Sequence, residues 1–178
     1  MPGIDQSRTL HPLRIAVLTV SDTRTEESDT SGRLLAERLT AAGHDLAARA
    51  IVGDEIEAIR AQVQAWVSDP AVDVVLTTGG TGFAPRDVTP EALKPLFRRD
   101  IDGFAAVFHQ ASFGTVGLST IQSRACAGQI EDTFVFSLPG STGACRDGWD
   151  LVLASALDSR YRPCSFAEQV PRLRHLFE

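Results

Sequence analysis

A glycine-rich run, Thr78-Gly79-Gly80-Thr81-Gly82, is the part of this sequence best suited to chemistry. Glycine has no side chain to obstruct a ligand, so backbone N–H groups can point at the oxygens of an anion, and the threonine hydroxyls add further donors. A tight turn would explain a single glycine. For three glycines directly after a buried strand, binding of a phosphate is the better interpretation.

A second polar loop, Pro139-Gly140-Ser141-Thr142, precedes the last long helix. Unsatisfied N–H groups and the helix dipole favour an anion there, but Ser141 or Thr142 could equally serve only as the helix cap. Cys145, in the first turn of the same helix, could be an activated thiolate. A small buried core residue is the favoured interpretation for it.

Other candidate residues also follow predicted strands. Ser21 and Asp22 stand directly after the first long strand, a position that favours ligand contact over helix capping. Asp54 opens the run Asp54-Glu-Ile-Glu57, which has the form of a capping box. The local sequence therefore favours a structural role for Asp54 at a helix N-terminus.

Asp87 has no comparable local duty, because Thr89 is expected to cap the helix that follows it. A carboxylate beside a phosphate-binding loop would repel the phosphate unless a cation lay between them, so Asp87 is predicted to be a Mg²⁺ ligand. For Arg86 the sequence supports two interpretations equally. Its guanidinium could bind phosphate, or it could remain solvated and pair with Asp87.

Short apolar, β-branched runs alternate with amphipathic segments along the chain, which predicts strands alternating with helices. The predicted strands are 14–20, 47–52 and 73–78, and the predicted helices are 30–42, 56–66, one opening at Thr89 and one containing Phe104 and Ala111. This order predicts an α/β fold with three layers, α/β/α, around a mostly parallel central sheet. Because parallel strands end at one edge, the loops after Val20, Thr78 and Leu138 should meet there.

Later in the chain, segments 121–130 and 133–138 flank a short polar turn and could pair as a hairpin. Trp149 and Leu153 are expected to line the core face of a final helix. The length of 178 residues favours one domain, 1–178, with an N-terminal extension, 1–12, and a C-terminal tail, 162–178. We expect that tail to pack on the surface or on a partner chain.

Composition excludes several classes of function. The net charge is −6, and the basic residues, sixteen Arg and Lys94, are spread along the chain, which argues against nucleic-acid binding. Lys94 does not lie in a P-loop, which excludes a Walker-type kinase or ATPase. Cysteines and histidines lack the spacing of disulfide, redox or zinc sites. With no signal-peptide core and no apolar run near the roughly 20 residues of a membrane span, we expect a soluble cytoplasmic protein without a membrane partner.

The run Thr78 to Gly82, followed by Pro85-Arg-Asp-Val-Thr-Pro-Glu-Ala92, resembles the signature of the MoaB/MogA family of molybdenum cofactor biosynthesis proteins. Leu138-Pro-Gly-Ser141 is a second landmark of that family. The resemblance extends from about Arg14 to Leu157. The segments Thr120 to Gly128 and Pro139 to Trp149 look more like the MoaB branch than the MogA branch.

This resemblance implies an α/β/α fold assembled into a homo-trimer or homo-hexamer that binds molybdopterin, a pterin dithiolene with a terminal phosphate. In active relatives ATP and Mg²⁺ adenylylate that phosphate, and two essential aspartates of the family match Asp54 and Asp87. We therefore expect Asp54 and Asp87 to be catalytic and to organise Mg²⁺. The two glycine-containing loops, with Ser21, Asp22 and Arg86, would bind the substrates ATP and molybdopterin. Other proteins of the pathway are possible partners.

Two alternatives belong to other classes of function. A MoaB-branch protein could bind molybdopterin or a partner protein without catalysis, and Thr142 stands here where the MogA branch has proline. A flavodoxin-like FMN carrier would use the loop from Ser21 to Thr25 for phosphate. ATP turnover separates the enzyme from the binding protein, and a colourless purified protein would argue against the flavin carrier.

Overall fold

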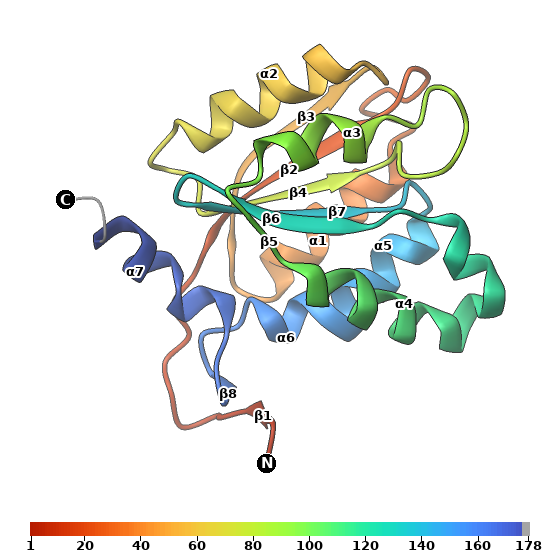
Figure 1. The fold of residues 1–178 in the computed structure, drawn as a ribbon. Helices are drawn as coiled ribbons and strands as arrows, with labels where there is room; N and C mark the ends of the chain where they lie inside the picture. Colours follow the sequence, from red (N-terminus) through yellow and green to blue (C-terminus); the bar gives the residue numbers. More distant parts are fainter. Residues whose placement is uncertain (176–178) are drawn as a thin grey trace.

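A twisted six-stranded sheet forms the centre of the molecule (Figure 1). The structure, a computed structural model, describes residues 1–175. Along the sheet the strands follow the order β3, β2, β4, β7, β6, β5. The first four are parallel, β6 runs antiparallel to β7, and β5 runs antiparallel to β6. Their bounds are β2 Arg14–Val20, β3 Asp45–Val52, β4 Val74–Thr78, β5 Arg99–Asp100, β6 Cys126–Ile130 and β7 Thr133–Leu138.

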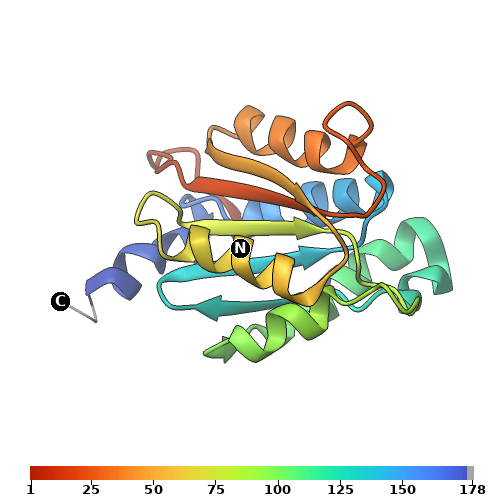
Figure 2. The same cartoon turned by 90° about the horizontal axis from the view of Figure 1, so that it is seen from above.

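Helices cover both faces of the sheet, as Figures 1 and 2 show. One face carries α2 (Ile56–Val67) and α3 (Thr89–Leu93). The opposite face carries α1 (Thr30–Ala41), α4 (Asp102–Val116) and a continuous helix made of α5 (Thr142–Gly148), a π-helical turn (Trp149–Leu153) and α6 (Ala154–Ala156). The predicted three-layer α/β/α architecture is confirmed.

Successive side chains of each strand point to opposite faces of the sheet, so the hydrophobic core consists of two layers. Val17, Leu76 and Phe136 pack toward α1, α4 and α5, whereas Leu18 and Val75 pack toward α2 and α3. Because helices cover both faces of the parallel strands, the sequences of these strands are nearly continuous apolar runs. This made the strands easy to predict.

Two local predictions are wrong. Segment 121–130 is not one strand, because Gly117–Gln122 forms a 3-10 turn with exposed Leu118 and Ile121, and pairing with β7 starts only at Cys126, where the side chains become buried. Thr89 is not the N-cap of α3, which is Val88. The buried Thr89 hydroxyl donates instead to the carbonyl of Gly79 (2.8 Å), and so joins the helix to the glycine-rich loop.

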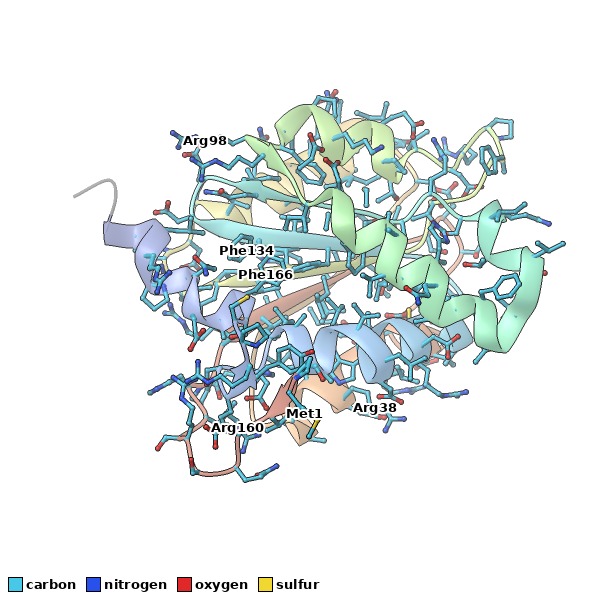
Figure 3. The ribbon with its side chains drawn as sticks, turned by 60° about the horizontal axis from the view of Figure 1, so that its bottom comes forward. Met1, Arg38, Arg98, Phe134, Arg160 and Phe166 are labelled. Carbon is cyan, nitrogen blue, oxygen red and sulfur yellow. The ribbon has the colours of Figure 1, made fainter. Side chains whose placement is uncertain are left out.

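The C-terminal tail packs on the chain's own core as far as it is described. A 3-10 turn (Phe166–Glu168) and α7 (Val170–His175) place Val170 and Leu173 among the buried core residues. The centroids of the Phe166 and Phe134 rings are 5.0 Å apart. Figure 3 labels both residues. At the other end, β1 (Gly3–Ile4) pairs antiparallel with β8 (Tyr161–Arg162). In residues 1–175 no helix is long and apolar enough to cross a membrane.

Acid should destabilise this fold through His44. His44 is buried just after α1, its Nδ1 accepts from the backbone N–H of Leu13 (3.1 Å), and its ring packs edge-on against Trp149. Burial lowers the pKa of His44 below its ordinary value of 6.5, although Asp158 acts in the opposite direction. Protons therefore bind the unfolded chain more tightly, and the free energy of unfolding should fall as the pH drops below about 6.5.

His44→Asn provides the control, because its amide oxygen can accept from Leu13 but does not titrate in this range. Denaturant titrations at about pH 7.5 and pH 5.5 should show a larger loss of stability for the unaltered protein than for the variant. Equal losses would show that His44 does not contribute to the acid sensitivity.

Candidate functional site

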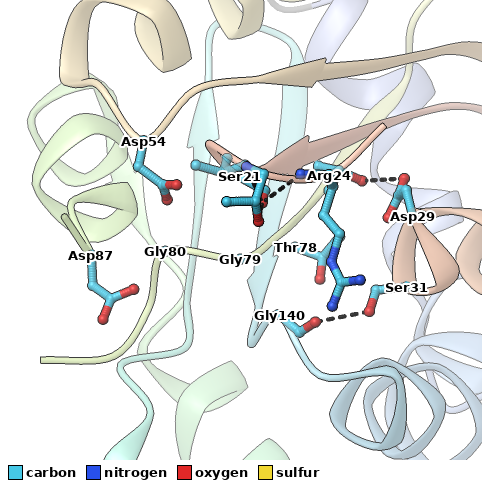
Figure 4. A pocket seen from close by; sticks show the side chains of 13 residues that line it. Ser21, Arg24, Asp29, Ser31, Asp54, Thr78, Gly79, Gly80, Asp87 and Gly140 are labelled. Carbon is cyan, nitrogen blue, oxygen red and sulfur yellow. Dashed lines mark hydrogen bonds between the residues drawn. The ribbon is translucent and has the colours of Figure 1, made fainter. Parts of the chain in front are cut away.

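The loops after β2, β4 and β7 meet at one edge of the sheet, as predicted, and enclose a cavity of about 290 Å³. Figure 4 shows Asp54 and Asp87 at one end of this cavity, beside Gly80, and Asp29 and Ser31 at the other end. The cavity is lined by Thr19, Val20, Ser21, Thr23, Arg24, Asp29, Ser31, Asp54, Thr78, Gly79, Gly80, Asp87 and Gly140.

Bare backbone forms the floor of the cavity. Gly79 and Gly80 have φ values of +102° and +64°, which side chains rarely allow. A Cβ on Gly79 would collide with the carbonyl of Val20, and a Cβ on Gly80 with the Thr89 hydroxyl. A Cβ on Gly140 would stand 3.1 Å from the Cα of Gly79, so the two loops approach each other through glycines. This arrangement suits an anion that must lie close to the backbone.

Asp54 is joined to Asp22 rather than to its own helix. A carboxylate oxygen of Asp54 accepts from the backbone N–H of Asp22 (2.8 Å), and Asp22 accepts from the N–H of Asp54 (3.0 Å). The N-cap of α2 is Glu55, which makes no side-chain capping bond, so the predicted capping role of Asp54 is wrong. Burial, helped by the charges of Asp22 and Asp87, raises the pKa of Asp54 above its ordinary value. A cation nearby would relieve that repulsion.

Asp87 does have a local structural role, contrary to prediction. One of its carboxylate oxygens accepts from the backbone N–H of Ala84 (2.8 Å), and its own N–H donates to the carbonyl of Ala84 (2.9 Å). These two bonds close the turn after the glycine-rich loop. The carboxylate still lines the cavity opposite Asp54, and a Cβ on Gly82 would lie 2.7 Å from it.

Arg86 pairs with Asp22 and not with Asp87. Its Nε and Nη2 donate to the two carboxylate oxygens of Asp22 at 2.9 and 2.8 Å. Hydrogen bonds from Arg86, followed by that from the Asp54 backbone, lower the pKa of Asp22. The pair is exposed, so it does not prevent the guanidinium from reaching a phosphate; the predicted contact with phosphate stays a prediction.

The residues of the second loop, 139–142, have different roles. Gly140 lines the cavity, whereas the Ser141 hydroxyl caps α5 by accepting from the backbone N–H of Ala144 (3.1 Å). The Thr142 and Thr30 hydroxyls form a hydrogen bond (2.8 Å), and Thr78 donates to the carbonyl of Pro139 (2.9 Å). Other predicted site residues lie outside the lining of the cavity, namely Asp22, Thr81, Gly82, Arg86, Pro139, Ser141 and Thr142.

Ser21 lines the cavity and also shapes its own loop. The Ser21 hydroxyl accepts from the backbone N–H groups of Thr23 and Arg24, both at 3.2 Å. Cys145 is fully buried beside Thr78, and burial raises its pKa to about 11. The favoured interpretation of Cys145 as a core residue is confirmed.

Sequence reasoning missed the far wall of the cavity, which is built around buried Asp29. This carboxylate accepts from the Gly32 N–H (2.9 Å), the Thr19 hydroxyl (2.8 Å) and Arg49 Nη2 (2.7 Å). Burial alone would raise its pKa, but these hydrogen bonds lower it overall. Asp29 thereby caps α1, whose Ser31 hydroxyl donates to the carbonyl of Gly140 (2.8 Å) and connects the first and third loops.

Pro139 and Ser141, the neighbours of Gly140, line a second cavity of about 320 Å³. Apolar groups of Phe108 and Pro139 and the hydroxyls of Thr120, Ser123 and Ser141 line it, together with the carboxylate of Asp147. Such a mixture of apolar and polar lining residues is typical of sites for small organic ligands.

The two aspartates are compatible with Mg²⁺. Within residues 1–175, no group of three or more histidine, cysteine or acidic side chains could hold a metal by itself. Mg²⁺ commonly uses only one or two carboxylates and completes its octahedron with water and substrate phosphates. Asp54 and Asp87 beside a bare backbone floor meet that requirement.

Comparison with known proteins agrees with this geometry. Residues 16–159 match the family described as "Probable molybdopterin binding domain". The chain is 52% identical over 155 residues to Molybdenum cofactor biosynthesis protein B of Escherichia coli K12, covering 87% of this chain and 91% of the relative. The protein of the same name in Bacillus subtilis is 49% identical over 135 residues, or 75% and 79% of the two chains. A crystal structure of Molybdenum cofactor biosynthesis protein B superposes with a TM-score of 0.85 at 39% identity, covering 94% of this chain and 99% of that one.

Proposed function

Because this chain belongs to the molybdopterin-binding domain family of molybdenum cofactor biosynthesis proteins, we propose that it binds molybdopterin and adenylylates its terminal phosphate with ATP. The observation that carries the proposal is the cavity in which Asp54 and Asp87 face the bare backbone of Gly79, Gly80 and Gly140. With ATP as a substrate, the reaction would take place in the cytoplasm.

Adenylyl transfer depends more on the positioning of the two substrates than on a general base. An oxygen of the terminal phosphate of molybdopterin attacks the α-phosphorus of ATP, a new P–O–P bond forms, and the bond to the β-phosphate breaks to release pyrophosphate. The attacking phosphate is already an anion, so no histidine or cysteine is required to remove a proton. Backbone N–H groups of Gly80 and Gly140 and the Ser21 hydroxyl would hold the phosphate oxygens.

The charges around the cavity support the binding of a cation. Three carboxylates, Asp29, Asp54 and Asp87, line the cavity, and Arg24 is the cationic side chain among its lining residues. Asp29 is already paired with Arg49, which leaves Asp54 and Asp87 to hold Mg²⁺. When bound, Mg²⁺ would neutralise charge on the phosphates.

A ligand with a phosphate at one end and a pterin at the other fits the two cavities. Gly140 lines the first cavity, and its neighbours Pro139 and Ser141 line the second. The phosphate would lie on the glycine floor and the pterin in the second cavity beside Pro139, with hydroxyls at its edges. Both loops predicted from the sequence would then contact the same molecule.

The test is direct. Purified protein mixed with molybdopterin, ATP and Mg²⁺ should yield adenylylated pterin and pyrophosphate, which chromatography and a phosphate assay detect. Pterin binding without product would favour the non-catalytic binding protein, and a yellow protein with bound flavin would favour the FMN carrier. Product that forms equally well without Mg²⁺ would contradict the role given to the two aspartates.

We also propose that the protein is a homo-oligomer. Residues 103–123 contain no Asp, Glu, Lys or Arg. This uncharged stretch exposes large apolar side chains on α4 and on the 3-10 turn after it, namely Val107, Phe113, Val116, Leu118 and Ile121. Lack of charge together with exposed apolar groups is typical of the centre of a protein interface. A second copy of this chain is the occupant that the family resemblance implies.

A charge on this surface should dissociate the oligomer. Leu118 and Ile121 are 72% and 68% exposed, so Leu118→Glu and Ile121→Glu should fold normally. Each should weaken association by about tenfold or more, because an unpaired carboxylate would be buried at the interface. Sedimentation measures the change. Leu151→Glu, at an exposed position on another helix, should keep the original mass, and an unaltered protein that is already monomeric would refute the proposal.

A further inference from the structure

Arg124 makes contacts that neither the fold nor the proposed chemistry accounts for. It follows the 3-10 turn Gly117–Gln122 and leads into β6, and its side chain is only 27% exposed. Nε donates to the carbonyl of Gly82 (2.9 Å), Nη2 donates to the carbonyl of Asp87 (2.7 Å), and Nη1 pairs with the carboxylate of Glu91. In addition, the backbone N–H of Arg124 donates to the carbonyl of Thr81 (2.9 Å).

These contacts hold both ends of one exposed loop. Between Gly82 and Asp87 the chain leaves the sheet, and the hydrogen bonds between Ala84 and Asp87 only stabilise its turn. The Arg86–Asp22 pair that attaches this loop to the loop after β2 is exposed. Thr89 holds the preceding glycines through the carbonyls of Gly79 and Gly80. Arg124 holds the carbonyls at positions 81, 82 and 87, and its guanidinium lies 5.4 Å from the centre of the Phe83 ring.

We propose that Arg124 is a positioning residue that fixes the Asp87 carboxylate at the cavity. Arg124 does not line the cavity, and its charge is paired with Glu91, so it acts on the backbone that carries Asp87 and not on the ligand. All three guanidinium nitrogens already have partners within the loop and α3. The kinetic consequence rests on the proposed function, whereas the effect on the loop does not.

Arginine is required because the acceptors lie in three directions. Its planar guanidinium offers donors on separate nitrogens, which matches two carbonyls and a carboxylate at once. The ammonium of lysine is a single point on a flexible stem and would satisfy only part of this set. Arg124→Lys should therefore retain part of the positioning effect on the loop, and Arg124→Met should retain none of it.

The experiment compares Arg124→Met and Arg124→Lys with the unaltered protein. Hydrogen exchange of peptides covering residues 81–91 should become about tenfold faster in Arg124→Met, because local opening then costs less free energy. With molybdopterin, ATP and Mg²⁺, kcat should fall by about 10- to 100-fold, since a displacement near 1 Å is enough for such a loss. The Mg²⁺ concentration for half-maximal activity should rise, while the KM for molybdopterin should change little. Arg124→Lys should lie between.

Arg160→Met is the matched control, because Arg160, labelled in Figure 3, is a similarly buried arginine that pairs with Asp158 (2.7 Å) and does not line the cavity. It should leave exchange of residues 81–91 and kcat unchanged. Unaltered exchange in Arg124→Met, or faster exchange with unaltered kcat and Mg²⁺ dependence, would overturn the proposal. If the unaltered protein shows no turnover, the proposed function fails by itself, and the positioning role is then decided by exchange and by calorimetric binding of Mg²⁺ with ATP.

Discussion

Replacing Asp87 with alanine should lower the rate of adenylyl transfer by about 10²- to 10³-fold, the usual loss when one preorganised electrostatic group is removed from a reaction centre. Molybdopterin should still bind within a few-fold of its original affinity, because the glycine floor and the second cavity are left intact. Pyrophosphate release gives the rate, and quenching of pterin fluorescence on titration gives the affinity.

Asp87→Asn separates the two roles of this side chain. The amide oxygen of asparagine can still accept from the Ala84 N–H and preserve the turn, but asparagine carries no charge for Mg²⁺. If Asp87 is a metal ligand, Asp87→Asn should be nearly as inactive as Asp87→Ala. An asparagine variant that retains most of the activity would show that Asp87 serves the turn and not the metal.

Much of the fold was predictable because its causes are local. Strands β2 and β4 are short β-branched apolar runs, and α2 shows its helical repeat directly, so period and composition were sufficient. The meeting of three loops followed from parallel strand direction alone. In the same way, the glycine-rich run indicated a close approach of backbone to ligand, and the positive φ values of Gly79 and Gly80 agree with that expectation.

What could not be predicted depends on partners distant in sequence. Asp54 looked like a helix cap because its own neighbours have capping types, but its hydrogen-bond partner is Asp22, 32 positions away. One of the two equal interpretations of Arg86 paired it with the adjacent Asp87, yet it pairs with Asp22, 64 positions away. Asp29 gave no signal beyond its place before a helix, since its burial and its contact with Arg49 depend on how α1 and β3 pack. Side-chain pairing of this kind follows from the tertiary structure and not from local spacing.

Gly79→Ala should lower both the free energy of unfolding and the affinity for the substrates. An alanine at φ +102° is strained, and its Cβ would collide with the carbonyl of Val20, a backbone atom that cannot rotate away. We expect a loss of about 2–4 kcal/mol in the free energy of unfolding, the range for backbone strain combined with a steric clash. The loop must also shift away from Val20, so affinity for ATP and molybdopterin should fall by about tenfold or more, as for other losses of preorganised geometry. Denaturant titration and calorimetry measure the two effects.

Gly103→Ala is the control that isolates this cause. A Cβ at Gly103 meets no atom within 4 Å, and the residue lies in the first turn of α4 with an ordinary φ. Alanine there should be neutral or stabilise the protein by up to about 1 kcal/mol, because it favours a helix over the unfolded chain. Equal effects of the two substitutions would mean that the close approach of β4 to β2 at Gly79 is not required. A loss of ligand affinity confined to Gly79→Ala would support the binding of phosphate by the bare backbone of this loop.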